Sequence, residues 1–139
     1  MKNRDEILAF MQSKTLMTIS SLNEKGTPQA AVVGVGVTDD FRLVFGTSNT
    51  SRKYKSITAR PSVAAVIGWD GPETVQYEGE ARELKGVEAD ELSELYFAHN
   101  PMARKFKDNP DQAYFVVQPT WLRYTNLASH PWDITELSF

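Results

Sequence analysis

The sequence predicts a mainly β domain, either an antiparallel barrel or a sandwich, with a few helices at its periphery. Between residues 16 and 84, short stretches of alternating or β-branched residues are separated by turn residues such as Gly, Pro, Asn and Asp. Only the stretches 4–13 and 86–100 combine length with apolar residues at helical spacing. With 139 residues and no linker-like or repeated segment, residues 1–139 are expected to form a single domain.

The individual elements follow from period-two alternation in strands and from capping residues and apolar stripes in helices. We expect strands at 16–22, 29–38, 41–47, 62–69, 74–84, 114–117 and 121–127, and helices at 4–13, 52–59 and 86–100, with a short helical turn at 102–107. Residues 62–69 are nearly all apolar, so this strand is expected to be covered on both faces. Pro119 lacks a backbone donor and is expected to interrupt the last two strands.

Apolar residues assign a buried face to most of these elements. The expected buried sets are Ala31, Val33, Val35 and Val37 in the second strand, Phe41, Leu43 and Phe45 in the third, Val75, Tyr77 and Ala81 in the fifth, and Val87, Leu92, Leu95 and Tyr96 in the long helix. The opposite face of the second strand has little side-chain bulk, because Gly34 and Gly36 lie on it. A barrel bend and a close approach of a planar ligand explain these glycines equally well.

Composition excludes several classes of protein. The net charge is −3, whereas a dedicated nucleic-acid-binding domain is usually basic. The absence of cysteine excludes disulfide scaffolds and thiol catalysis and fits a reducing cytoplasm, which is the expected localisation. No stretch approaches the ~20 apolar residues of a membrane span. His99 and His130 are the only histidines and have no second ligand at metal-binding spacing, so we expect no bound metal ion.

Residues 46–57 contain the clearest sign of a binding site. Ser51 is a good N-cap for the helix that follows, and Arg52 and Lys53 then lie in the first turn of that helix. The positive end of the helix dipole disfavours cations there by roughly 0.3–1 kcal/mol each. A bound phosphate would offset this repulsion, because it accepts hydrogen bonds from backbone amides, hydroxyls and a guanidinium together. From residue types alone, a phosphate site and a solvated basic turn are equally good interpretations.

The same segment is the centre of a family resemblance. This part of the chain resembles the FMN-binding split-barrel family in the order of its elements. A strand leads into Phe-Gly-Thr-Ser-Asn-Thr-Ser-Arg-Lys at 45–53, and a helix, Arg60-Pro61 and the apolar strand 63–69 follow. That family includes pyridoxamine 5′-phosphate oxidase and the general stress proteins. The resemblance extends over residues 16–84 and includes 119–124. It implies an antiparallel FMN-binding split β-barrel that forms a homodimer and binds flavin at the subunit interface. The charge and composition described above argue against a membrane or nucleic-acid partner.

The resemblance also implies roles for individual residues. The implied cofactor contacts are Thr47, Ser48, Ser51, Arg52 and Lys53 for the FMN phosphate, Val32 and Val33 along the isoalloxazine ring, Gln76 at its polar edge, and Trp121 and Arg123 from the second subunit. Thr74, on the same strand face as Gln76, is a competing assignment for the polar edge.

The activity implied by the resemblance is that of a small FMN-dependent oxidoreductase. Hydride would pass between the flavin and a stacked substrate, so no side chain is required as an acid or base. The C-terminal residues lack the arginine and histidine, one residue apart, of pyridoxamine 5′-phosphate oxidase, which argues against vitamin B6 oxidation. The alternatives are a reductase that uses the deazaflavin F420, and a non-catalytic flavin-binding stress protein or haem-binding relative.

Overall fold

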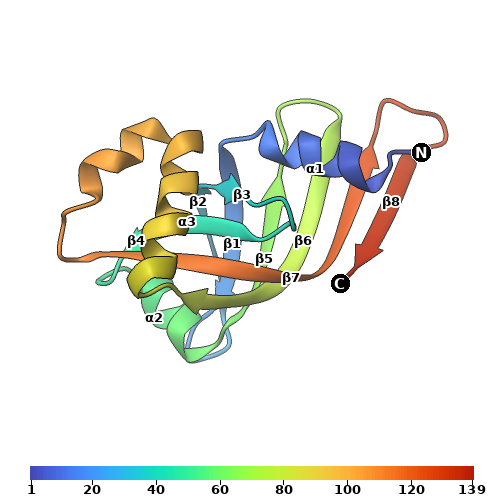
Figure 1. The fold of residues 1–139 in the computed structure, drawn as a ribbon. Helices are drawn as coiled ribbons and strands as arrows, with labels where there is room; N and C mark the ends of the chain where they lie inside the picture. Colours follow the sequence, from blue (N-terminus) through green and yellow to red (C-terminus); the bar gives the residue numbers. More distant parts are fainter.

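The computed structural model describes residues 1–139, which form one antiparallel sheet curled into a half-barrel, with helices around it (Figure 1). The helices are α1 (Arg4–Gln12), α2 (Arg52–Ala59), α3 (Gly86–His99) and the 3-10 helix η1 (Pro101–Phe106). The strands are β1 (Leu16–Leu22), β2 (Pro28–Gly34), β3 (Gly36–Val37), β4 (Leu43–Ser48), β5 (Ser62–Ile67), β6 (Glu73–Glu83), β7 (Gln112–Asn126) and β8 (Asp133–Ser138). The expected mainly β class with peripheral helices is confirmed.

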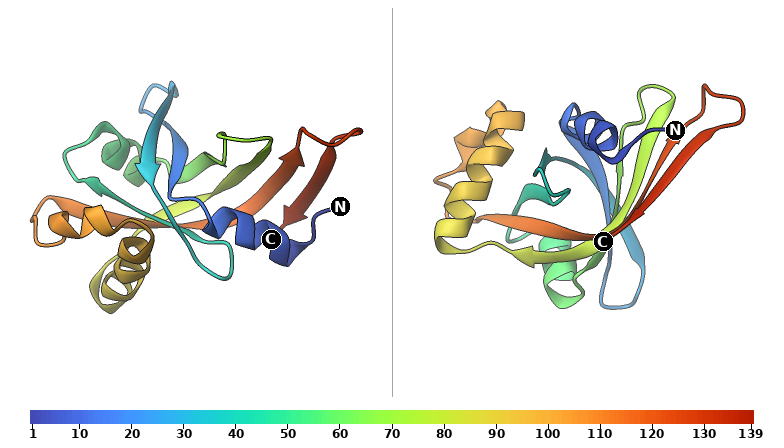
Figure 2. Two further views of the ribbon diagram at one scale, coloured as in Figure 1. Left: turned by 90° about the horizontal axis from the view of Figure 1, so that it is seen from above. Right: turned by 45° about the vertical axis from the view of Figure 1, so that its right-hand side comes forward.

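The strand order explains why the sheet curls. The order is β2-β1-β5-β6-β7-β4-β3, and every neighbouring pair is antiparallel. The long strand β7 pairs with β4 along its first half and with β8 along its second half (Figure 2). Although β2 and β3 follow each other in the chain, they form the two opposite edges of the sheet. The sheet must therefore curl back on itself, and β2 also contacts β4.

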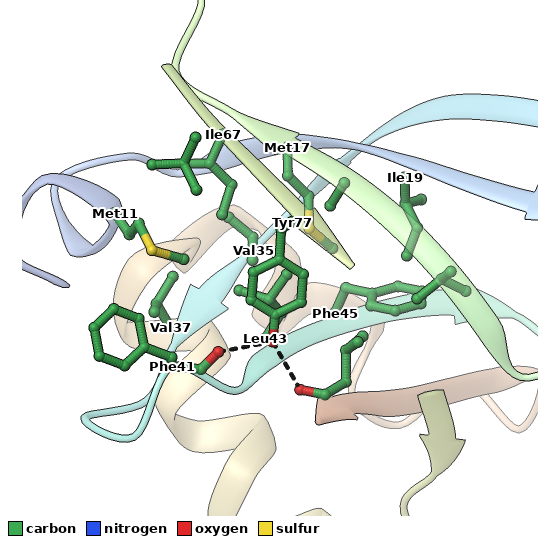
Figure 3. Close-up of a cluster of buried hydrophobic side chains, with 14 of the residues drawn as sticks. Met11, Met17, Ile19, Val35, Val37, Phe41, Leu43, Phe45, Ile67 and Tyr77 are labelled. Carbon is green, nitrogen blue, oxygen red and sulfur yellow. Dashed lines mark hydrogen bonds between the residues drawn. The ribbon is translucent and has the colours of Figure 1, made fainter. Parts of the chain in front are cut away.

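The concave side of the sheet holds the main hydrophobic core. Figure 3 shows Met17 and Ile19 of β1 and Phe45 of β4 gathered around Tyr77 of β6, all of them almost fully buried. The Tyr77 hydroxyl lies 2.8 Å from the carbonyl oxygen of Phe41, in the turn before β4. Burial of such large side chains is the main favourable contribution to folding, at roughly 1.5–3 kcal/mol for each.

The helices cover different parts of this sheet. Helix α1 begins with a capping box between Asn3 and Glu6 and buries Ile7 and Met11 in the main core. Helix α3 covers the other face of β4 and β7, where Tyr96 and Phe97 pack with Val44, Leu84 and Val116 in a second, smaller core. No helix in the structure has both the length and the apolar character needed to cross a membrane.

The convex face of β1, β2 and β5 is open to solvent in this single chain. Along β5, buried residues alternate with exposed or half-buried ones such as Ala64 and Val66. The expectation that residues 62–69 are covered on both faces is therefore wrong for this chain by itself. Their apolar outer side chains form part of an uncovered sheet surface, for which an apolar sequence gives no separate signal.

The expected strand 29–38 is interrupted at Val35. The chain leaves the β1 side of the sheet after Gly34 and joins the β4 side at Gly36. Helix α3 lies against both glycines: a Cβ at Gly36 would lie 2.8 Å from the Leu95 side chain, and one at Gly34 would meet the side chain of Asn100. The glycines thus permit close packing where the chain crosses from one edge of the sheet to the other.

Three further expectations need correction, and one strand was missed. Phe41 is buried but precedes β4 in a turn, with a positive φ of 68°. Strand β7 continues through Pro119, because a register shift opposite Glu78 and Gly79 accommodates the proline. Strand β8 was not expected at all. Val87 is 72% exposed, because α3 buries its opposite side through Ser93, Tyr96 and Phe97.

Candidate functional site

The loop between β4 and α2 brings several hydroxyl groups to the beginning of a helix. Ser51 is the N-cap of α2, as expected, and its hydroxyl accepts the Tyr54 amide at 3.2 Å. The Thr47 hydroxyl at the end of β4 lies 3.0 Å from the same Ser51 oxygen, and Ser48 contacts the Thr50 hydroxyl at 2.8 Å. Local capping chemistry therefore brings three of the expected phosphate contacts together, beside the unpaired amides of a helix N-terminus.

Two cations occupy the first turn of this helix, where the helix dipole opposes positive charge. Arg52 and Lys53 form none of the ten ion pairs in the chain, whereas Lys55 on the next turn lies 4.0 Å from Glu24. Both side chains line a surface depression of about 350 Å³ against β1 and β2. Their positive charge is not neutralised by a carboxylate of this chain.

Gln29 is a member of this cluster that the sequence analysis missed. Its side-chain amide forms hydrogen bonds with two neighbours. The amide oxygen accepts from Arg52 Nε at 3.2 Å and from Arg52 Nη2 at 2.6 Å, and the amide nitrogen donates to the Ser56 hydroxyl at 3.2 Å. This arrangement holds the guanidinium against β2. The available signal was the position of Gln29 at the start of a strand, on the same face as Ala31, but the contact joins residues far apart in the chain.

A nearby carboxylate is already engaged elsewhere. The Tyr54 hydroxyl donates to Glu83 of β6 at 2.7 Å, and this hydrogen bond raises the pKa of Tyr54. Lys85 lies 2.8 Å from the other carboxylate oxygen of Glu83. Glu83 is therefore engaged by Tyr54 and Lys85, and it forms no ion pair with Arg52 or Lys53.

Strand β2 lies beside this cluster and is an edge of the sheet, so one side of its backbone has no strand partner. Val32 points away from the core and is 59% exposed, whereas Val33 is half-buried and packs against the main core. Ala30 and Ala31, which line the depression with Arg52, are small. A flat group can therefore approach the β2 backbone closely without meeting a bulky side chain.

The other three expected contacts lie on the convex face, away from this cluster. Register pairing aligns Val32 of β2, Gln76 of β6 and Arg123 of β7 in one row across the sheet. Gln76 is three strands from Val32, or about 14 Å at ordinary strand spacing. Trp121 occupies the next row on the same face. Within one chain, the ten expected residues thus form two separate groups.

Glu136 of β8, which the sequence analysis did not single out, holds two members of the second group. Its carboxylate accepts from Arg123 Nε at 2.9 Å and from the Trp121 indole N–H at 3.4 Å. The hydrogen bond with Arg123 lowers the pKa of Glu136. Thr74 is half-buried opposite Thr125 of β7, and its assignment relative to Gln76 stays a prediction.

The first group combines donors that suit a phosphate with a free strand edge beside them. The helix amides, the Ser51 and Thr47 hydroxyls and the unneutralised charges of Arg52 and Lys53 suit a phosphate dianion. The free edge of β2 offers backbone donors and acceptors to a planar heterocycle. The depression extends beyond the cations to Ala30 and Ala31, so it has room for a group larger than a phosphate.

Comparisons with known proteins place the chain in a family. A sequence model of the pyridoxamine 5′-phosphate oxidase family matches residues 4–126. The pyridoxine/pyridoxamine 5′-phosphate oxidase of Thermosynechococcus vestitus is 29% identical over 103 residues, which cover 73% of this chain and 47% of the relative. The chain thus aligns with less than half of that relative's length.

Solved structures show the same fold. General stress protein 26 of Bacillus anthracis superimposes with a TM-score of 0.76 at 18% identity, over 99% of this chain and all of that chain. A pyridoxamine 5′-phosphate oxidase-related, FMN-binding protein of Nostoc punctiforme has a TM-score of 0.65 at 12% identity, over 98% and 91% of the two chains. By its sequence match and its split-barrel fold, the chain belongs to the pyridoxamine 5′-phosphate oxidase family.

Proposed function

We propose that this protein binds FMN and functions as a small flavin-dependent oxidoreductase. The observation that supports it most is the pair of cations, Arg52 and Lys53, which lack carboxylate partners and line a depression between a helix N-terminus and the edge strand β2. Membership of the family and the FMN-binding relative from Nostoc punctiforme support the choice of flavin.

Each residue of the cluster has a defined task in this proposal. Arg52 and Lys53 neutralise the phosphate, and Ser51 and Thr47 donate hydroxyl hydrogen bonds to it. Gln29 keeps the guanidinium of Arg52 against β2, which reduces the rotamer entropy that the side chain loses on binding. Bound FMN would supply the hydride-transfer chemistry, while the chain orients the ring along β2.

We further propose that the protein works as a homodimer. At ordinary strand spacing, Gln76 lies about 14 Å and Arg123 about 19 Å from Val32 along one row of the sheet. Both are therefore too far away to reach a ring that lies along the β2 edge of the same chain. A second copy placed against the convex face would bring its own Arg123 and Trp121 toward that ring. The uncovered apolar side chains of this face, such as Val66, favour such an interface.

The test is an FMN titration of the Arg52→Ala/Lys53→Ala double variant. Loss of two charge-assisted hydrogen bonds, at ~1.5–3 kcal/mol each, should weaken FMN binding by about 100-fold or more without unfolding the protein. The matched control is Lys55→Ala/Arg60→Ala, which removes two cations of the same region that contact Glu24 instead. Unchanged FMN affinity in the Arg52/Lys53 variant would contradict the proposal.

The same preparations separate the alternatives. Tighter binding of F420 than of FMN would favour a deazaflavin-dependent reductase. Stoichiometric FMN binding without turnover by reduced nicotinamides and common electron acceptors would favour a flavin-binding stress protein without catalysis.

A further inference from the structure

The last strand, β8, places one carboxylate beside the two convex-face residues, Trp121 and Arg123, that the proposed function brings to the flavin of a partner subunit. Strand β8 pairs with the end of β7 (red in Figure 1), and Glu136 lies directly opposite Arg123 in the register of this pair. Directly opposite residues of antiparallel strands have Cβ atoms about 4.5–5.5 Å apart. The proposed function so far gives Glu136 no task.

Both oxygens of the Glu136 carboxylate are engaged. Oε1 accepts from Arg123 Nε at 2.9 Å and also from Arg123 Nη2, whereas Oε2 accepts from the Trp121 indole N–H at 3.4 Å. The guanidinium carbon of Arg123 lies 5.8 Å from the centre of the Trp121 ring, within the range of a cation–π contact. Trp121, Arg123 and Glu136, which we call the Arg123 cluster, are therefore held together by mutual contacts.

Glu136 is the carboxylate that neutralises Arg123 in this chain. The residue opposite Arg123 on β6 is the uncharged Gln76, and Glu78, opposite Trp121, forms none of the ion pairs. The hydrogen bonds from Arg123 and then from Trp121 hold the pKa of Glu136 below its ordinary value, so this carboxylate is ionised at neutral pH. The Arg123 cluster thus offers hydrogen-bond donors but carries no net charge.

The charge near a flavin matters because reduction changes the charge of its ring. Uptake of two electrons and one proton gives the ring one negative charge, so a nearby cation favours reduced over oxidised flavin and a nearby carboxylate opposes this. In the single chain, the Arg123 and Glu136 side chains are 40% and 45% exposed, and water screens their charges. Against a partner subunit they would be less hydrated, so the balance between the two charges would have a larger effect.

We propose that Glu136 lowers the reduction potential of the flavin bound by the partner subunit, because it neutralises the positive charge that Arg123 would otherwise present to the ring. The inference rests on the proposed binding of FMN at a dimer interface. A purely structural role for Glu136 has a different consequence. If the carboxylate only oriented Arg123, its removal would weaken the contact between this cation and the reduced ring, and the potential would fall instead of rising.

The test is the potential of FMN-loaded protein, measured by titration with dithionite beside a redox dye of known potential. Glu136→Gln keeps the shape of the side chain and removes its charge, so it should favour reduced over oxidised FMN by about tenfold, which raises a two-electron potential by about 30 mV. Arg123→Gln should lower the potential, and the double variant should lie close to the wild type. The matched control is Glu88→Gln, because Glu88 holds Arg82 through two hydrogen bonds, at 2.6 and 2.7 Å. This control should leave the potential unchanged.

A second measurement needs no flavin. In protein without FMN, the indole N–H resonance of Trp121 in a ¹H–¹⁵N NMR spectrum, assigned by its loss in Trp121→Phe, should shift in Glu136→Gln, because a glutamine has one oxygen acceptor where the carboxylate has two. Glu88→Gln should leave this resonance in place. An indole resonance that does not respond to Glu136→Gln would mean that the Arg123 cluster is not formed in solution, which would overturn the inference.

Failure of this inference and failure of the proposed function are distinguishable. If the proteins bind FMN but the potential of Glu136→Gln is unchanged or lower, only the inference about Glu136 is wrong. Equal shifts in Glu136→Gln and Glu88→Gln would also overturn it, because they would show a general effect of surface charge. If the wild-type protein does not bind FMN at all, the proposed function is wrong, and the inference that rests on it is wrong as well.

Discussion

Removal of the side-chain hydroxyl from each of two tyrosines should change the stability of this protein in opposite directions. The Tyr77 hydroxyl, at the centre of the main core, lies 2.8 Å from the Phe41 carbonyl and 3.2 Å from the Val117 carbonyl (Figure 3). The Tyr114 hydroxyl is buried beneath α3, beside the ring of Phe97, and has no hydrogen-bond partner. We therefore expect Tyr77→Phe to destabilise the protein and Tyr114→Phe to stabilise it.

The expected changes in stability follow from the hydrogen bonds that each hydroxyl makes or lacks. A hydroxyl has one proton, so Tyr77 shares a single donor between two carbonyls, and its removal leaves buried acceptors without that donor. The expected loss is about 1–3 kcal/mol in the free energy of unfolding. The Tyr114 hydroxyl is desolvated without compensation, so its removal should add about 1 kcal/mol. Burial raises the pKa of both hydroxyls, which agrees with their removal from water.

Urea unfolding followed by circular dichroism measures both effects. The urea midpoints of the two variants should move in opposite directions from that of the wild-type protein, with unchanged slopes. A loss of stability in Tyr114→Phe as large as that in Tyr77→Phe would refute the reasoning. So would a Tyr77→Phe variant with wild-type stability, because either result would mean that these hydrogen-bond environments do not determine the effect.

Two further substitutions test the sheet and the α3–η1 connection. Gly79→Ala at the β6 register shift should destabilise by about 1–3 kcal/mol, because the added methyl group would collide with the Gln118 carbonyl, whereas Gly71→Ala meets open space and should leave the urea midpoint unchanged. Hydrogen bonds from Arg104, and to a lesser extent from Lys107, lower the pKa of Glu94 from 4.5 to about 2. The ionised Glu94 therefore stabilises the folded protein fully above pH 4.5, and this stabilisation is lost as the pH falls toward 2. Glu94→Gln should flatten the decline of the urea midpoint over this acid interval, and an unchanged decline would contradict the assignment.

Short-range chemistry made parts of the fold predictable. The bounds of β1 and the start of α2 at the Ser51 cap agree with the expected elements, because alternation and capping depend on residues within a few positions of one another. The hydroxyl and cation cluster at residues 47–53 was predictable for the same reason. Its members are nearly contiguous, so their proximity did not depend on how the sheet folds.

Expectations failed where distant segments decide the outcome. The break at Val35 depends on α3, which packs against the flanking glycines from 60 residues away along the chain at Leu95. The passage of β7 through Pro119 depends on a register shift in the facing strand β6. The contacts of Gln29 with Arg52 and of Arg123 with Glu136 likewise join different elements, and no local pattern signals them.

The sequence by itself determined the class of fold, the helix cap at Ser51 and the excess positive charge beside it, because these follow from nearest-neighbour chemistry and residue alternation. Only the tertiary structure decided that Arg52 lies against an open strand edge and that Gln76 and Arg123 lie across the sheet from it. Each of these depends on the curl and register of the sheet, which are set by packing between segments far apart in the chain.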